Sequence, residues 1–238
     1  SDSLVNDDGN GNPVYDEDAF NAYKEAVNNI DNALDKNLPK SEQSVVDEAT
    51  GALNNALNTL ESSRYYTVTF LDAEGNILTS ERFVSGAAFG TIVAPALPEG
   101  TDEIAVCGWA YENDALAGAD DVLTSDVTVK VAAEDKVLRI FNESGFAFDT
   151  ATGYIVTESR SLTVAEVLAK FDNDASVLVI KDFNGNVLSA DDYVGSGATV
   201  TLESKYCDGV TYESRTFVVY GDVNGDGLVN ADDYAISR

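Results

Sequence analysis

Histidine and methionine are absent from the 238-residue sequence, and cysteine occurs only twice. Without histidine the chain cannot form a Ser-His-Asp or Cys-His nucleophile pair or a histidine-based zinc site, and two cysteines are too few for a four-thiolate zinc site. No stretch approaches the roughly 18–20 apolar residues that a membrane-spanning helix needs. Because translation starts with methionine, we expect the sequence to be a piece of a longer protein, without a signal peptide.

Positive charge is also scarce, with 14 Lys and Arg residues against 42 Asp and Glu residues and a net charge of −28. Nucleic-acid binding requires clustered Lys and Arg to contact phosphates, so we expect no nucleic-acid partner. An anionic membrane surface is disfavoured for the same reason. The acidity fits a soluble extracellular protein in a calcium-containing environment, and an apolar content of 44% is enough for several small cores.

Oxygen-bearing side chains are spaced like calcium ligands in the stretch 221–233. A calcium loop of the EF-hand type places ligands at positions one, three, five, nine and twelve, a backbone carbonyl at position seven, and a glycine at position six, where the chain turns sharply. We therefore predict a Ca2+ site, with an Asp/Asn/Gly-rich surface turn as the alternative. Gly227 takes position six, and the predicted ligands are Asp222, Asn224, Asp226, the Leu228 carbonyl, Asn230 and Asp233.

Two other stretches begin in the same way but do not complete the pattern. In the stretch 182–193, Val187 takes the glycine position and Tyr193 takes the twelfth position. In the stretch 8–13, Pro13 stands where the glycine belongs. We predict that both are surface turns, so they are internal controls for the loop that starts at Asp222.

Two details distinguish this loop from an ordinary EF-hand. Its twelfth residue is Asp233 where an EF-hand has glutamate, and the run 216–220 before it is typical of a strand, not of a helix. The stretch 221–238, which begins with the sequence GDVNGDGLVNADD, resembles the first of the two repeats of a type I dockerin.

The dockerin resemblance implies a role in assembly. Dockerins bind cohesin domains of a scaffoldin, as in the cellulosome, and so place their protein in a polysaccharide-degrading or cell-surface complex. At loop positions ten and eleven, Ala231 and Asp232 would lie where dockerins usually contact cohesin. The resemblance also implies a protein secreted to the bacterial cell surface.

Residues 14–63 are predicted to form two antiparallel helices, because apolar residues recur at intervals of three and four. The run 38–40 should end the first helix, and Ser41 should cap the second. The wording of residues 46–57 resembles a FIVAR-type region of bacterial surface proteins, which implies a spacer or a carbohydrate or cell-wall contact. Residues 1–13 are expected to be disordered or loosely packed. The predicted apolar stripes are Phe20, Tyr23, Val27, Ile30 and Leu34, then Val46, Ala49, Leu53, Leu57 and Leu60.

Residues 64–135 change to a period of two. The alternating runs 66–70 and 77–84 are separated by a turn at 72–76, which predicts a β-hairpin. Together with a strand at 124–131, this layout is similar to the β-grasp-like repeats of the internalin B-repeat type. Trp109, the only tryptophan, is predicted to fill the core of a small sheet, and the alternative is an exposed platform for stacking on a sugar.

Residues 136–220 are predicted to form an α+β module with one helix. Thr163 and Glu166 have the spacing of a capping box in front of an apolar helix face. The arrangement resembles the X-module that often precedes a dockerin. Because the last predicted strand runs directly into the loop that starts at Asp222, we expect the two to be packed together. The predicted strands are 177–180, 187–188, 198–202 and 216–220, with a type I′ turn at Asn184-Gly185.

The prediction is thus an α+β multi-module fold with a helical hairpin, a β-grasp-like module, a single-helix α+β sheet module and a partial EF-hand-like dockerin loop. Its function would be that of a monomeric, non-catalytic extracellular anchoring tail, because such short modules offer no deep cleft for the carboxylate pair of a glycosidase. The alternative is a carbohydrate-binding or adhesin module. Cys107 and Cys207 lie in different predicted modules, which leaves both a disulfide and two separate thiols open.

Overall fold

The structure is a computed structural model that describes residues 4–35 and 43–237. It is an α+β fold, as predicted, and it divides into two compact units. The first unit comprises Ser1–Leu97 and Gly108–Val131, and the second comprises Pro98–Cys107 and Ala132–Arg238. The predicted helix break at 38–40 and the predicted Ser41 cap lie outside the described residues. Within the described part of the chain, no helix is long and apolar enough to cross a membrane.

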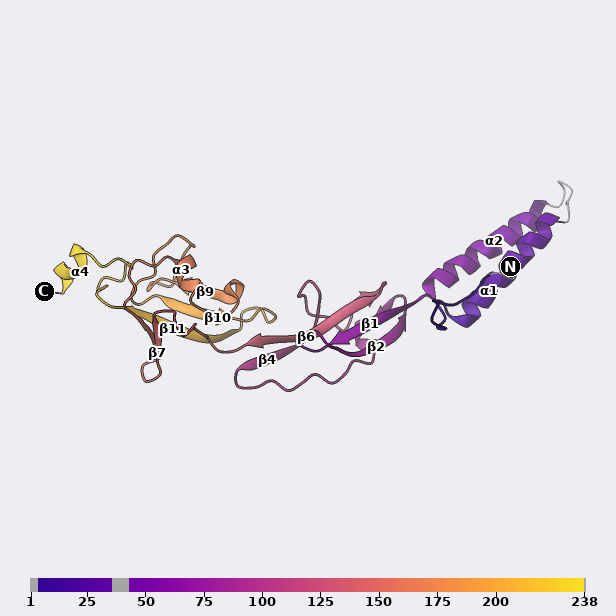
Figure 1. Cartoon of the computed structure of the whole chain (residues 1–238). Coiled ribbons are helices and arrows are strands. Elements are labelled where there is room, and N and C mark those ends of the chain that lie inside the picture. The colour runs from indigo at the N-terminus through magenta and orange to yellow at the C-terminus, as the bar shows by residue number, and fades with distance from the viewer. Residues whose placement is uncertain (1–3, 36–42, 238) are drawn as a thin grey trace. The chain divides into compact units, whose positions relative to one another are not determined.

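The two predicted helices are α1 (Glu17–Asp35) and α2 (Gln43–Ser62), which lie side by side (Figure 1). Their buried residues differ from the predicted stripes, because small alanines at seven-residue spacing occupy the space between the helices. Leu34 and Leu57, which were predicted to face the partner helix, are exposed. In a two-helix hairpin only the residues directly between the axes are covered, so the larger flanking side chains stay half-buried. The buried residues are Ala19, Ala26, Ala33 and Leu60.

Residues 4–13, which were predicted to be disordered, are described as a hydrogen-bonded loop. The Asn6 side chain donates to the Tyr15 carbonyl at 2.7 Å and accepts from the Tyr15 backbone N–H at 2.8 Å. The Arg82 guanidinium donates to the Pro13 carbonyl. Composition predicts disorder from the lack of apolar residues, but it does not reveal these polar partners elsewhere in the chain.

A four-stranded sheet has the order β2-β1-β6-β4. The predicted hairpin is present, since β1 and β2 are antiparallel and Tyr65 is paired with Val84. Strand β1 also runs parallel to β6, with Val68 opposite Val127. Trp109 is 7% exposed and packs edge-on against Phe70, with 4.9 Å between ring centroids, so the prediction that Trp109 fills a core is confirmed. The strands are β1 (Tyr65–Leu71), β2 (Ile77–Val84), β4 (Ile104–Tyr111) and β6 (Val127–Asp135), with a small pair β3 (Ala87–Ala88) and β5 (Val122–Leu123) and a 3-10 turn η2 (Phe89–Thr91).

A five-stranded sheet in the second unit has the order β7-β8-β11-β10-β9, and its β8–β11 pair is parallel. Strands β7 and β8 were not predicted. The predicted strand at 187–188 is reduced to an isolated bridge between Lys181 and Val187. The strands are β7 (Phe146–Asp149), β8 (Tyr154–Thr157), β9 (Leu178–Lys181), β10 (Thr199–Glu203) and β11 (Thr211–Val219), with a 3-10 turn η3 (Ala175–Val177) before β9.

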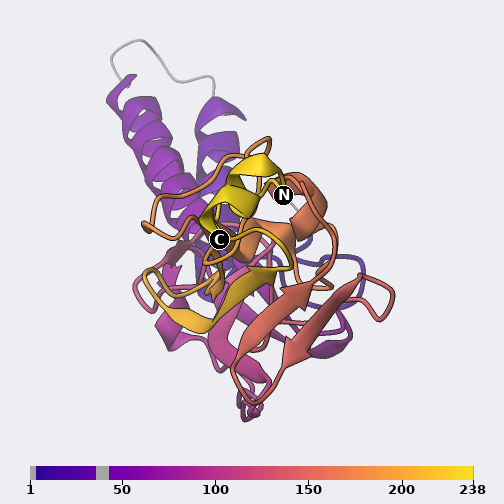
Figure 2. The same ribbon diagram turned by 90° about the vertical axis from the view of Figure 1, so that its left-hand side faces the viewer.

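Helix α3 (Val164–Leu168) covers one face of this sheet (Figures 1 and 2). The predicted capping box is confirmed, because the Thr163 hydroxyl accepts from the Glu166 N–H at 3.3 Å and a Glu166 carboxylate oxygen accepts from the Thr163 N–H at 2.8 Å. Val164 and Val167 of the helix join a single apolar core with residues from all five strands. Short helix α4 (Ala231–Ile236), shown in yellow in Figure 2, follows the C-terminal loop.

Candidate metal centre in the C-terminal loop

The predicted calcium loop joins the end of β11 to the start of α4. Gly227, at loop position six, is buried and has φ +80, a left-handed conformation that favours glycine. A Cβ atom at Gly227 would lie 2.7 Å from the Tyr193 Cβ, so the position also lacks space for a side chain. The glycine that the loop pattern requires is therefore required by this structure for two separate reasons.

The carboxylates at the two ends of the loop, Asp222 and Asp233, are buried. Asp222 accepts from the Gly225 N–H at 2.8 Å on one oxygen, and from the Ser196 and Gly227 N–H groups at 2.7 and 3.2 Å on the other. Buried carboxylates are costly unless hydrogen-bonded, so these bonds hold the loop closed on Asp222.

Asp233 has a corresponding role at the other end. One of its oxygens accepts from the Val223 and Asn224 N–H groups at 2.8 and 3.2 Å, and the other accepts from the Asn230 N–H at 2.8 Å. Asn230 and Asp233 together form a capping box at the start of α4. Sequence reasoning assigned both residues to calcium and missed this second role, although the Asn-x-x-Asp spacing signals it.

Half-buried Asn224 and exposed Asp226 pair with each other inside the loop. The Asn224 side-chain amide donates to Asp226 at 2.9 Å, and the Asp226 and Leu228 N–H groups donate to the Asn224 and Asp226 side chains at 3.0 and 2.8 Å. The Asn230 side-chain oxygen accepts from the Asp232 N–H at 2.7 Å. Side chains of the loop thus organise its own backbone.

The donor set fits Ca2+ in chemistry, since every predicted ligand atom is an oxygen. An ionised carboxylate has about four acceptor sites, and the bonds above occupy three on Asp222, three on Asp233 and two on Asp226. Each carboxylate therefore keeps capacity for a cation. However, no three Asp, Glu, Cys or His side chains in residues 4–35 and 43–237 are grouped closely enough to hold one metal ion together.

The loop is packed on the chain segment 193–197 that precedes β10. The Ser196 hydroxyl accepts from the Val219 N–H at 3.0 Å and donates to the Val219 carbonyl at 3.2 Å. The Ser161 N–H donates to the Gly227 carbonyl at 3.1 Å. These contacts confirm the prediction that the loop and the preceding α+β module are packed together. That Ser196 and Gly195 provide the surface could not be predicted from the sequence.

Replacing Gly195 by alanine is expected to lower the free energy of unfolding of the second unit by about 1–3 kcal/mol. A Cβ atom there would lie 2.3 Å from the Gly225 carbonyl oxygen and 2.6 Å from the Gly227 nitrogen, and both are backbone atoms that cannot rotate away. Urea denaturation followed by circular dichroism measures the change. The matched control is Gly51→Ala in α2, where a Cβ atom would meet nothing within 4 Å. This substitution should stabilise the helix by about 0.5–1 kcal/mol. Equal effects of the two substitutions would contradict the close packing.

The end of the loop is expected to resist mild acid. The hydrogen bond from the Asn230 N–H, followed by those from Val223 and Asn224, holds the pKa of Asp233 below its usual value, although burial acts in the opposite direction. A depressed pKa means that the stabilisation is complete above the ordinary Asp value and is lost only as the pH falls through the lower folded-state value. A carboxyl-carbon NMR titration should place the Asp233 midpoint below that of a model aspartate, and a midpoint above it would contradict these bonds.

The predicted cohesin contacts are exposed, and the two control stretches form turns. Ala231 and Asp232, the predicted cohesin contacts, are exposed in the first turn of α4. The control stretches are hydrogen-bonded turns, as predicted, because Asp182 and Asp8 each accept from both the backbone and the side-chain amide of an asparagine four residues later.

The sugar platform predicted as an alternative is not formed by Trp109, which is buried. An open cavity of about 300 Å³ lies nearby in the first unit. Tyr111 lines it, and the Tyr111 hydroxyl donates to Asp121 at 2.8 Å. The other lining residues are Glu112, Asn113, Asp126, Val127 and Thr128.

Comparison with known proteins identifies no relative: no family model matches the chain, and neither the curated proteins nor the solved structures searched contain a match.

Proposed function

We propose that the chain is a non-catalytic extracellular anchoring tail whose C-terminal loop binds Ca2+. The observation that carries the proposal is the loop from Asp222 to Asp233, in which oxygen donors occupy every ligand position of a calcium loop and Gly227 occupies position six, where the structure leaves no space for a side chain. The net charge of −28 supports it, since an acidic surface attracts divalent cations.

In this proposal Asp222, Asn224, Asp226, the Leu228 carbonyl, Asn230 and Asp233 would hold the ion. Ca2+ would supply positive charge among the loop's oxygens. The two buried carboxylates already hold the ends of the loop, and Asp226 keeps acceptor capacity for the ion beside its bond from Asn224. We further propose that, with a second repeat, the tail docks onto a cohesin of a scaffoldin through the exposed Ala231 and Asp232.

The calcium site is tested by isothermal titration with CaCl2. The Asp226→Ala variant is expected to weaken binding about tenfold or more, because it removes a charged ligand. Asp226 is preferable to Asp222 for this test, since Asp222 also accepts three backbone bonds that hold the loop. The matched control is Asp182→Ala in the incomplete loop, which should leave the affinity unchanged. Equal affinity of the Asp226→Ala and unmodified chains would refute the site.

Cohesin binding is tested by a pull-down of a two-repeat form of the tail with scaffoldin cohesins, with and without a chelator. Retention that is independent of both the chelator and substitutions of Ala231 and Asp232 would contradict the docking proposal.

A carbohydrate-binding or adhesin role is the second candidate, and the open cavity beside Tyr111 is the observation that favours it. An aromatic ring with neighbouring Glu112, Asn113 and Asp126 combines a stacking surface with hydrogen-bonding groups. The test is binding of the chain to a polysaccharide array. Loss of this binding in a Tyr111→Ala variant whose fold is intact by circular dichroism would support the carbohydrate-binding role over the anchoring role.

A further inference from the structure

Both cysteines of the chain are linked to one carboxylate in the second unit, Cys107 directly and Cys207 through Ser204. The Cys107 thiol donates to Glu134 Oε1 at 3.1 Å. The Ser204 hydroxyl donates to the same oxygen at 2.5 Å, and the Cys207 backbone N–H donates to the Ser204 hydroxyl at 2.7 Å. Residues 100 positions apart in the sequence are thus brought to either side of one glutamate.

The Cys107 thiol is half-buried beside Glu134. Burial is the main cause that raises the pKa of Cys107 to about 12, and the contacts with Glu134 and with the Cys207 side chain add to it. Both cysteines are half-buried, and neither is in a disulfide in this structure. Both therefore remain accessible to a small oxidant.

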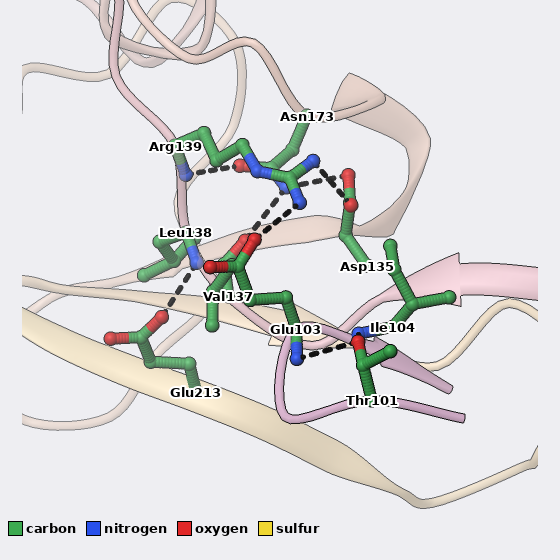
Figure 3. A network of polar contacts seen from close by, with 9 residues as sticks. All are labelled: Thr101, Glu103, Ile104, Asp135, Val137, Leu138, Arg139, Asn173 and Glu213. Atoms are coloured by element: carbon green, nitrogen blue, oxygen red, sulfur yellow. Dashed lines mark hydrogen bonds and ion pairs between the residues drawn. The ribbon is translucent and has the colours of Figure 1, made fainter. Parts of the chain in front are cut away.

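The segment 98–107, which ends at Cys107, is held within the second unit. Figure 3 shows the contacts of this segment around Thr101 and Glu103. The Arg139 guanidinium bridges Glu103 at 3.4 Å and Asp135 at 2.5 Å. The Lys136 N–H donates to the Glu103 carbonyl at 2.7 Å, and the Lys136 ammonium donates to the Thr101 carbonyl at 3.0 Å. These contacts fix the segment that carries Cys107, so the position of its thiol is defined.

The Cys207 side is fixed by the same glutamate. Glu134 Oε2 accepts from the Lys205 N–H at 2.6 Å, and Oε1 accepts from the Tyr212 hydroxyl at 2.7 Å. Lys205 precedes Cys207 in the turn between β10 and β11, and Tyr212 follows it at the start of β11. Glu134 therefore holds the turn with Cys207 and the strand end with Cys107 together.

We propose that Cys107 and Cys207 form a disulfide when the protein meets a small disulfide oxidant, and that this bond closes the segment 98–107 onto the β10–β11 turn. The Cys207 thiolate attacks the oxidant and forms a mixed disulfide, releasing one oxidant thiolate. Cys107 then gives its proton to the oxidant thiolate released in the first step and attacks the Cys207 sulfur, and the second oxidant thiolate leaves. Both protein thiols are oxidised, the oxidant is reduced to two thiols, and these take up the two protons.

Cys207 makes the first attack because the Cys107 thiol is protonated near neutral pH. A crosslink between positions 107 and 207 closes a long loop of the unfolded chain, which is where chain-entropy stabilisation is largest. The extracellular setting of the proposed function would favour the bond, but the chemistry depends on neither calcium nor cohesin.

The test uses the full chain, purified in reductant and then exposed under native conditions to oxidised glutathione. We expect an intact mass lower by about 2 Da, a linked peptide pair containing Cys107 and Cys207, and a melting temperature of the second unit higher by about 10 °C. The Cys207→Ser variant should melt like the reduced chain and gain no stability from the oxidant.

Three outcomes would overturn the proposal. These are two thiols that stay titratable after oxidation, two separate glutathione adducts without a linked peptide, or crosslinked dimers on a non-reducing gel. The Cys107→Ser variant should behave in the same way. Because each variant replaces a single sulfur atom at a different position, the same loss of crosslinking in both checks that the loss does not come from misfolding.

Discussion

Replacing Trp109 by alanine is expected to lower the free energy of unfolding of the first unit by about 3–5 kcal/mol. The Trp109 side chain is buried and its ring packs edge-on against Phe70 in the four-stranded sheet. Truncation removes a large apolar surface from the core and leaves a cavity that the sheet cannot close, because Phe70 is itself fully buried. Urea denaturation followed by circular dichroism measures the loss.

The matched control is Trp109→Phe, which keeps an aromatic ring and should cost about 1–2 kcal/mol. A Trp109→Ala chain that kept its stability but lost affinity for a polysaccharide would contradict the core role and would support the sugar platform instead.

Replacing Glu134 by alanine is expected to lower the free energy of unfolding of the second unit by about 2–4 kcal/mol. The substitution leaves the Tyr212 and Ser204 hydroxyls and the Lys205 N–H without their shared acceptor. Burial alone would raise the pKa of Glu134, but the bonds from Ser204, Tyr212 and Cys107 outweigh it and lower the pKa. The carboxylate is therefore ionised at neutral pH, and bonds to an ionised acceptor are the stronger kind.

Two controls test whether the loss depends on the negative charge of Glu134 and on its position in the cluster. Glu134→Gln keeps an acceptor oxygen and should lose less stability than Glu134→Ala. Glu203→Ala, in strand β10 of the same unit, removes an equal side chain from a position outside the cluster and should change stability little. Identical losses for the Glu134 and Glu203 variants would contradict the role of Glu134.

The fold was predictable where neighbouring residues decide it. The capping box at Thr163 and the hairpin turn at Asp72 depend on side chains that bond to backbone groups three or four residues away, so their spacing predicts the structure. Strands β7 and β8 were missed because each has only four residues, and the Asp149–Gly153 turn between them resembles a loop.

Burial in the helices was predictable only in part. The periodicity predicted that both helices are amphipathic, but no residue of the predicted stripe on α1 is buried, and Ala26 is buried while Leu34 is exposed. The spacing of residues defines a face, whereas the distance to the partner helix decides which side chains on that face are covered.

The candidate site divides in the same way. The sequence by itself determined the order of oxygen donors from Asp222 to Asp233 and the need for Gly227, because both follow from how a short loop can turn around its own side chains. Only the tertiary structure decided that Ser196 meets Asp222, that Gly195 touches Gly225, and that Cys107 and Cys207 are both linked to Glu134. These pairs are 26, 30 and 100 positions apart, and at such separations contact depends on how strands and turns pack rather than on the intervening residues.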